Sequence, residues 1–216
     1  MINDVPTSLG PGRLTVSEAA DPRAVVWLGH GAGGGIGAAD LTALAEHLPA
    51  HGFTVARYEQ PWRVAGKKIA PRPAALDVGW REAAPAVADL ANGLPLVVGG
   101  RSAGARVACR TADDLGAAAV LCLAFPLHPP GRPEASRLAE LLTPTVPALV
   151  LQGDRDTFGT ASDIEREIGE HKSVRVVPVP GADHSMKVLA SSPLKARDVA
   201  ALVTTSVTEF LSEVFA

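Results

Sequence analysis

Short apolar runs alternate with helical patterns along almost the whole chain, and this alternation restricts the fold more than any other feature of the sequence. Most of the runs are continuously apolar, as is typical of strands that are covered on both faces. The runs lie at 24–28, 54–58, 96–98, 118–123, 148–151 and 174–178, and the helical patterns at 39–50, 81–91, 103–111, 134–142, 162–169 and 195–215. The alternation predicts a three-layer α/β/α sandwich with a mostly parallel central sheet. A further run at 13–17 alternates between apolar and polar residues, which favours an antiparallel edge strand.

Length and charge limit the classes of function. We expect the 216 residues to form one domain, because they suffice for one sizeable core and are few for two. With 20 Lys and Arg against 23 Asp and Glu and no dense basic stretch, nucleic acid is not an expected partner. No apolar run reaches the roughly 18 residues of a membrane span, and residues 1–6 lack a signal-peptide pattern. We therefore expect a cytoplasmic chain without a membrane partner, and the oligomeric state stays open.

One serine stands where a predicted strand, a tight turn and a predicted helix meet. The sequence Gly100-Arg101-Ser102-Ala103-Gly104 follows the apolar run 94–99 and precedes the helical pattern that ends near 111. This is the layout of a nucleophile elbow, in which the serine hydroxyl is raised above the sheet and close packing excludes a Cβ atom on the flanking glycines. Because a Gly-x-Ser-x-Gly pattern also arises by chance, the assignment depends on the other residues at the same sheet edge.

Polar residues that could carry chemistry follow most of the predicted strands. In open parallel sheets, ligands bind beyond the carboxyl ends of the strands, where the segments 30–35, 125–128, 153–156 and 181–184 and the elbow would gather. A serine nucleophile needs a base, and the base needs an orienting carboxylate. The chain order required in such a fold is serine, then acid, then histidine. Ser102, Asp156 and His184 satisfy this order, so we predict them as nucleophile, acid and base.

Three other residues compete for these roles. Asp154 lies two residues before Asp156, and we expect it to cap the turn or to pair with Arg155 rather than to orient the base. Asp183 is adjacent to His184, but side chains of neighbouring residues in an extended loop tend to point apart. His128 also follows a strand, but it precedes the acid in the chain.

The glycine-rich segment 30–35 allows three interpretations. It could cradle a phosphate group, although it has neither the Gly-x-Gly-x-x-Gly pattern nor the Gly-Lys-Ser/Thr ending of nucleotide sites. It could be only a flexible turn. We favour an oxyanion hole, in which the backbone N–H groups of Ala32 and Ala103 point at the same substrate oxygen.

The sequence also suggests the shape of the substrate cleft. The segment 60–73 contains Trp62 and several basic residues, and it would either attract an anionic substrate or, more simply, form a solvated loop. Between 123 and 148 there is no room for a separate cap domain. We therefore expect a shallow, open cleft bordered by Tyr58, Trp62 and Phe125, which would cover only a short acyl chain.

Taken together, these motifs resemble the α/β-hydrolase superfamily over nearly the whole chain. The matching segments are His30-Gly31-Ala32-Gly33-Gly34, the elbow, Gly153-Asp154-Arg155-Asp156 and Asp183-His184. Arg101 of the elbow and the segments 125–131 and 153–159 are similar to the small, capless branch that includes dienelactone hydrolases and, more closely, Tex30/KANSL3-like hydrolase domains. The resemblance implies an α/β-hydrolase fold without a cap, with Ser102 as nucleophile, Asp156 as acid, His184 as base, and Ala32 and Ala103 as oxyanion donors. It departs from dienelactone hydrolases in having serine where they commonly have cysteine.

Two functions from different classes follow. The first is a serine hydrolase that cleaves a carboxylic ester or related acyl bond of a small molecule through an acyl-Ser102 intermediate, with no metal and no cofactor. Cys109 and Cys122 lie in apolar stretches and are interpreted as small buried residues rather than as a disulfide or a metal pair. The second is a catalytically silent hydrolase fold that acts as a protein-interaction module. The complete residue order and the glycine segment favour the enzyme, because a scaffold has no reason to hold a serine in a strained elbow.

Overall fold

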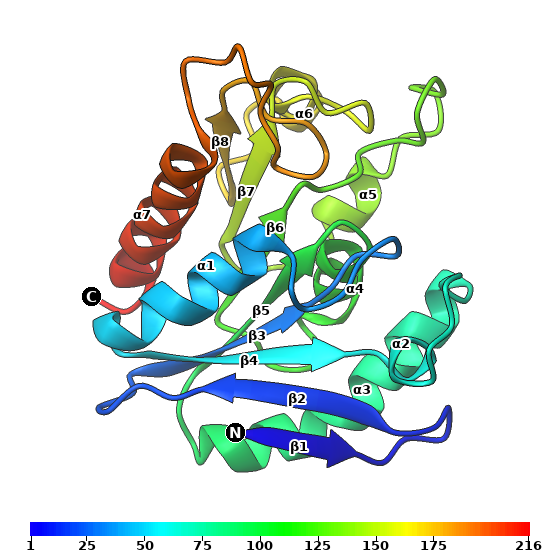
Figure 1. The fold of residues 1–216 in the computed structure, drawn as a ribbon, viewed down its shortest axis with the longest axis vertical. Helices are drawn as coiled ribbons and strands as arrows, with labels where there is room; N and C mark the ends of the chain where they lie inside the picture. Colours follow the sequence, from blue (N-terminus) through cyan, green and yellow to red (C-terminus); the bar gives the residue numbers. More distant parts are fainter.

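The computed structural model describes residues 1–216 and contains an eight-stranded sheet between two layers of helices (Figure 1). The strands are β1 (Ile2–Val5), β2 (Gly12–Ser17), β3 (Ala24–Gly29), β4 (Phe53–Glu59), β5 (Leu96–Arg101), β6 (Ala119–Leu123), β7 (Ala148–Gly153) and β8 (Val174–Val179). Their order in the sheet is β1-β2-β4-β3-β5-β6-β7-β8. β2 runs antiparallel to its two neighbours β1 and β4, whereas β3 to β8 run parallel to one another. This confirms the predicted sandwich with a mostly parallel sheet. The carboxyl ends of β3 to β8 therefore lie at one edge of the sheet.

The helices divide between the two faces of this sheet. They are α1 (Ala39–His47), the short 3₁₀ helix η1 (Leu48–His51), α2 (Pro61–Val64), α3 (Pro73–Ala91), α4 (Ala103–Thr111), α5 (Leu138–Leu141), α6 (Ala161–Ile168) and α7 (Ala196–Val214). Side chains of α1 and α7 belong to one buried apolar cluster, and side chains of α3, α4, α5 and α6 belong to another. None of the helices is both long and apolar enough to cross a membrane.

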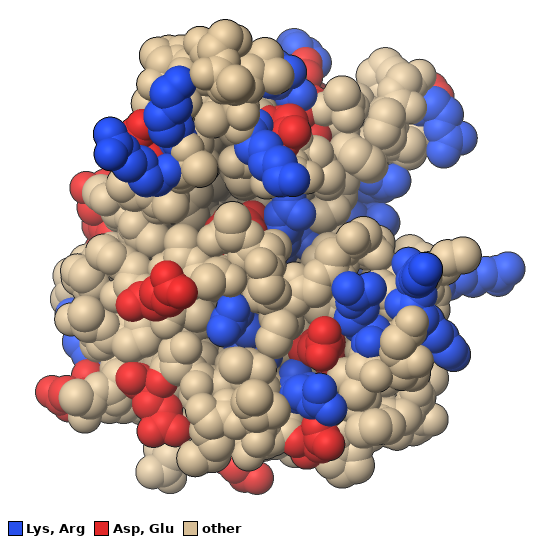
Figure 2. Space-filling view, viewed as in Figure 1, with Lys and Arg blue, Asp and Glu red and all other residues tan.

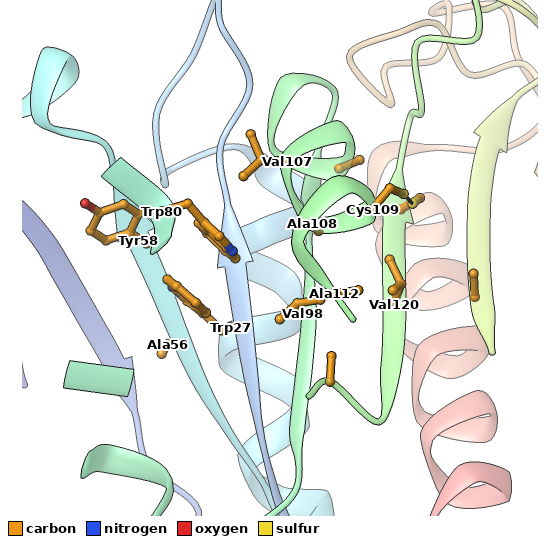
Figure 3. Close-up of a cluster of buried hydrophobic side chains, with 14 of the residues drawn as sticks. Trp27, Ala56, Tyr58, Trp80, Val98, Val107, Ala108, Cys109, Ala112 and Val120 are labelled. Atoms are coloured by element: carbon orange, nitrogen blue, oxygen red, sulfur yellow. Dashed lines mark hydrogen bonds between the residues drawn. The ribbon is translucent and has the colours of Figure 1, made fainter. Parts of the chain in front are cut away.

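Strand β3 illustrates why the apolar runs of the sequence are continuous. Its side chains alternate between the two clusters, so that Val25 and Trp27 pack on the α3 and α4 side while Val26 and Leu28 pack on the α1 and α7 side. Trp27 stacks on Trp80 of α3 with 3.6 Å between the ring centroids (Figure 3). A strand that is covered on both faces offers no solvent-exposed position for a polar side chain, and this favours an unbroken apolar pattern.

Several element boundaries differ from the sequence prediction. The prediction starts a helix at 81, but α3 begins at Pro73 and continues through Gly79. A Cβ atom on Gly79 would lie 2.7 Å from Oε1 of Gln60, so the glycine that weakens the helical pattern lies where α3 packs closely on the segment 60–61. The predicted helix 134–142 is reduced to α5, because the backbone N–H of Arg137 donates to the carbonyl of Leu127 at 2.6 Å. β1 and the short α2 were not predicted.

The two cysteines agree with their prediction as buried residues. Cys109 of α4 and Cys122 of β6 are fully buried and free, with 3.5 Å between their sulfur atoms.

Candidate active site

Ser102 lies between the end of β5 and the start of α4 with φ 53° and ψ −110°. Positive φ is uncommon for a residue with a side chain, so this turn is strained and is held by its surroundings. The flanking glycines explain how the turn fits. A Cβ atom on Gly100 or on Gly104 would lie 2.5 Å from the carbonyl oxygen of Gly29 at the end of β3. The elbow is therefore pressed against the neighbouring strand, as the sequence pattern predicts.

The structure brings Ser102, His184 and Asp156 into one chain of hydrogen bonds. Nε2 of His184 lies 2.9 Å from Oγ of Ser102, and Nδ1 of His184 lies 2.7 Å from Oδ2 of Asp156. A carboxylate can only accept, so Nδ1 carries the proton and Nε2 is free to accept the serine hydroxyl proton. The three side chains come from loops that follow β5, β7 and β8, which are separated by long stretches of sequence.

The environment of Asp156 fixes the direction of its carboxylate. Asp156 is only 3 % exposed. Oδ2 accepts a second hydrogen bond from Nε2 of Gln152 at 2.9 Å, and Oδ1 accepts from the backbone N–H of Phe158 at 2.8 Å. The ring of Phe158 also stacks on the His184 imidazole with 4.1 Å between centroids. Gln152 and Phe158 were not predicted as site residues, although Gln152 is the one polar residue in an otherwise apolar strand.

The competing acids and the competing histidine make other contacts. Asp154 accepts a hydrogen bond from the backbone N–H of Gly181 at 2.8 Å, which ties the loop after β7 to the loop after β8. Asp183 accepts from the backbone N–H groups of Ser185 and Lys187, so it caps the turn that follows His184. His128 bonds the carbonyl of Pro129 and does not contact Ser102.

Arg101 connects the elbow to the histidine loop. Its Nε donates to Oδ2 of Asp40 at 2.9 Å, and its Nη2 donates to the backbone carbonyl of His184. Asp40 lies in the first turn of α1 and is buried, which raises the pKa of its carboxyl even though the charge of Arg101 acts in the opposite direction. The residue before the nucleophile therefore holds the loop that carries His184, a contact that the sequence does not reveal.

Two backbone N–H groups beside Ser102 make no hydrogen bond within the protein. Ala103 is the first residue of α4, where a backbone N–H has no partner inside the helix. Ala32 donates no hydrogen bond within the protein. A Cβ atom on Gly31 would lie 3.4 Å from Cβ of Ser102, so the glycine segment runs directly beside the elbow. Ala32 and Ala103, the predicted oxyanion donors, both line the groove that contains Ser102.

His30, at the start of the glycine segment, is a structural residue. Its Nε2 accepts from the backbone N–H of Gln60 at 3.1 Å, and its Nδ1 bonds the carbonyl of Gly31 at 2.9 Å. This pairing requires a neutral ring with the proton on Nδ1. Burial accordingly lowers the pKa of His30 below its ordinary value of 6.5.

The lowered pKa of His30 makes stability depend on pH in a defined direction. The unfolded chain protonates this histidine more readily than the folded chain, so the free energy of unfolding should fall as the pH drops through 6.5. A His30→Asn variant should be less stable than wild type at about pH 7.5. The difference in free energy of unfolding between the two proteins should be smaller at about pH 5.5. Urea unfolding of both proteins at the two pH values measures this, and an unchanged difference would contradict the neutral, buried role of His30.

A groove with a volume of about 990 Å³ opens onto Ser102. One side consists of the glycine segment and the start of α1, and the other consists of residues 184–190 and the first turns of α7. Figure 2 shows a recess on this face of the molecule. The cleft is therefore not shallow as the sequence suggests, because the segment after β8 and α7 form a wall. No group of three or more His, Cys, Asp or Glu side chains is placed to hold a metal ion.

The three residues predicted to border the cleft lie elsewhere. Tyr58 and Phe125 are fully buried, and the Tyr58 hydroxyl donates to the carbonyl of Gly79 at 2.8 Å. Trp62 is almost buried and packs near His30, with 5.6 Å between the ring centroids. None of the three lines the groove with Ser102, so the substrate-binding prediction for them is wrong. Their apolar rings are placed in or against the core on the α3 side of the sheet.

Comparisons with known proteins agree with this architecture. A family model described as an alpha/beta hydrolase domain matches residues 22–212. Among solved structures, an α/β serine hydrolase without a lid from Xanthomonas campestris is similar with a TM-score of 0.76 and 20% identity, over 97% of this chain and 94% of that one. A dienelactone hydrolase from Anabaena variabilis has a TM-score of 0.74 and 16% identity, over 99% and 96% of the two chains. An alpha-beta serine hydrolase homologue from Coxiella burnetii has a TM-score of 0.77 and 15% identity, over 96% and 97%.

Proposed function

Because the chain belongs to the alpha/beta hydrolase family, we propose that it is a serine hydrolase that cleaves a carboxylic ester or related acyl bond. The observation that carries the proposal is the hydrogen-bonded chain from Asp156 through His184 to Ser102, which ends beside the groove. A serine in a strained turn, with a neutral imidazole within 2.9 Å of its hydroxyl, is the arrangement that makes an alcohol nucleophilic near neutral pH.

In the first half of the reaction, Ser102 forms a bond to the carbonyl carbon while its hydroxyl proton moves to Nε2 of His184. The negative charge that develops on the carbonyl oxygen is stabilised by the N–H groups of Ala32 and Ala103. Asp156 keeps the imidazole in the required tautomer and stabilises the imidazolium. His184 then donates this proton to the alcohol oxygen of the ester, and the C–O bond breaks. The alcohol departs, and the acyl group remains bound to Ser102.

In the second half, water takes the place of the alcohol. His184 accepts a proton from the water, the resulting hydroxide attacks the acyl carbon, and the same two N–H groups stabilise the second oxyanion. The proton on His184 passes to Oγ of Ser102 as the acyl bond breaks. The products are the carboxylic acid and the free enzyme, so the complete reaction consumes one ester and one water and needs no other reactant.

Labelling with a fluorophosphonate tests the proposal without knowledge of the substrate. An activated serine displaces fluoride and forms a stable O–P bond, so wild type should be labelled at Ser102 and Ser102→Ala should not be labelled. Ser185→Ala is the matched control, because Ser185 lines the same groove next to His184 but makes no contact with its imidazole. Peptide mapping identifies the labelled residue.

The same experiment evaluates the alternative of a silent interaction module. A folded wild-type protein that takes up no label would reject the hydrolase mechanism and favour that alternative. Label that persists in Ser102→Ala would place the reactive residue elsewhere in the chain.

A further inference from the structure

The groove beside Ser102 carries an excess of positive charge in a chain whose net charge is −3. The basic residues that line it are Arg101, Arg106, Arg137, Lys187 and Lys195, and the one acidic residue is Asp40. Asp40 is already paired with Arg101. Lys and Arg side chains are visible beside the recess in Figure 2. Asp40 is the only carboxylate in the lining of the groove, although Arg106 is paired with Glu140 outside it.

Arg137 is the cation without a protein counter-ion next to the elbow. Arg106 and Arg110 of α4 share the carboxylate of Glu140, and Arg110 also pairs with Asp77, with distances of 2.6 Å in each pair. Arg137 forms no ion pair, and its Nη1 donates only to the carbonyl of Pro126 at 2.9 Å. It is half-buried, and burial together with the nearby charge of Arg106 lowers its pKa.

The three arginines Arg106, Arg110 and Arg137 are connected to the nucleophile through α4. The backbone N–H of Arg106 donates to the carbonyl of Ser102 at 3.2 Å, so the two residues are one helical turn apart. Arg106 is joined to α5 by its two hydrogen bonds to Glu140, and Arg137 directly precedes α5. Ser102 and Arg137 line the same groove, so one substrate can place its reacting carbonyl at Ser102 and an anionic group at Arg137.

The other part of the groove is apolar. It is formed by Met186, Val188 and Leu189 of the segment after His184 and by Val199, Ala200 and Val203 of α7. Val199 and Val203 are buried and form part of the core between α7 and the sheet. These walls can cover a hydrocarbon chain, which favours binding in proportion to the apolar area removed from water.

We propose that the substrate is an ester that joins an apolar chain, bound between residues 186–189 and α7, to an anionic carboxylate or phosphate group bound by Arg137. The inference rests on the proposed hydrolase function and adds a substrate class to it. A guanidinium that has no counter-ion and is half-buried binds an oxyanion more strongly than a fully exposed one would, because less water competes for it.

Matched ester pairs test the anionic end. In 4-octanoyloxybenzoate the charge is on the alcohol side of the ester, and in octyl hydrogen succinate it is on the acyl side. In the neutral partner of each pair, the ester is kept and the free carboxylate is replaced by a carboxamide. For at least one pair, wild type should prefer the anion by about tenfold or more in kcat/KM, chiefly through KM. Arg137→Gln should reduce this preference to near one. Arg132→Gln, which removes a basic residue outside the groove, should retain it. Substituting 4-octanoyloxyphenyl phosphate for the benzoate decides between carboxylate and phosphate.

The apolar end is tested with chain length. For the preferred pair, wild-type kcat/KM should rise from two to eight carbons, by up to about fourfold per buried CH₂. Ala200→Phe should remove the rise with chain length, whereas Ala201→Phe, on the exposed side of α7, should retain it. Absence of an Arg137-dependent preference for either anion, or absence of the rise, would overturn the substrate assignment while fluorophosphonate labelling at Ser102 still supports the hydrolase. Loss of that labelling in wild type would instead reject the proposed function.

Discussion

Replacing Asp156 by Asn is expected to lower kcat for ester cleavage by a factor of about 10⁴. The asparagine amide has the size of the carboxylate, but it can present an N–H where Asp156 presents an acceptor to Nδ1 of His184 at 2.7 Å. The imidazole would then carry its proton on Nε2, the atom that has to accept the hydroxyl proton of Ser102. Steady-state rates with a p-nitrophenyl ester, compared at equal folded concentration, measure the loss.

Asp154→Asn is the matched control for this prediction. Asp154 is also a carboxylate in the loop after β7, but it accepts a hydrogen bond from the Gly181 backbone, and an asparagine oxygen can still accept that bond. Its replacement should change kcat little. A loss for Asp154→Asn as large as that for Asp156→Asn would leave the orienting acid unassigned, and a larger loss would transfer the role to Asp154.

The sequence is informative about this site because the relevant information is local. A continuous apolar run identifies a buried parallel strand, and the residues that follow such strands all meet at one edge. Ser102, Asp156 and His184 could therefore be placed near one another without knowledge of any side-chain contact. The alternating run at 13–17 also identified β2 as an antiparallel strand with one face less buried. Its expected place at the edge was wrong, because the unpredicted strand β1 pairs with its outer side.

The shape of the cleft could not be predicted from the sequence, because its walls depend on the paths of loops. Tyr58 is the last residue of the predicted strand 54–58, but the alternation along β4 turns its ring towards α3 and its hydroxyl to Gly79. The segment after His184 returns over the sheet edge because Asp183 caps its first turn and Lys195 donates to the carbonyls of Ala190 and Ser192. Side-chain to backbone contacts of this kind leave no periodic pattern in the sequence.

Gly104→Ala should reduce both stability and activity, although alanine is the better helix former. In a helix, alanine is favoured over glycine by about 1 kcal/mol. At this position, however, the new Cβ atom would lie 2.5 Å from the carbonyl oxygen of Gly29 and 3.0 Å from that of His30. Both are backbone atoms that cannot rotate away, and overpacking of this kind typically costs about 1–3 kcal/mol. We therefore expect a net loss of stability in urea unfolding.

The loss of activity should exceed what the loss of stability explains. Relief of the clash moves the start of α4 away from the segment 29–31, which separates the N–H of Ala103 from that of Ala32. Loss of one oxyanion donor typically lowers kcat by about 10²–10³, so the folded Gly104→Ala protein should be slowed by a factor of this order. Gly35→Ala is the control, because Gly35 lies in the glycine-rich segment 30–35 beside the elbow and its Cβ would meet only ordinary contacts at 3.6 Å. A Gly104→Ala protein with wild-type kcat would mean that the two amides do not act on one oxygen, since their separation could then change without consequence.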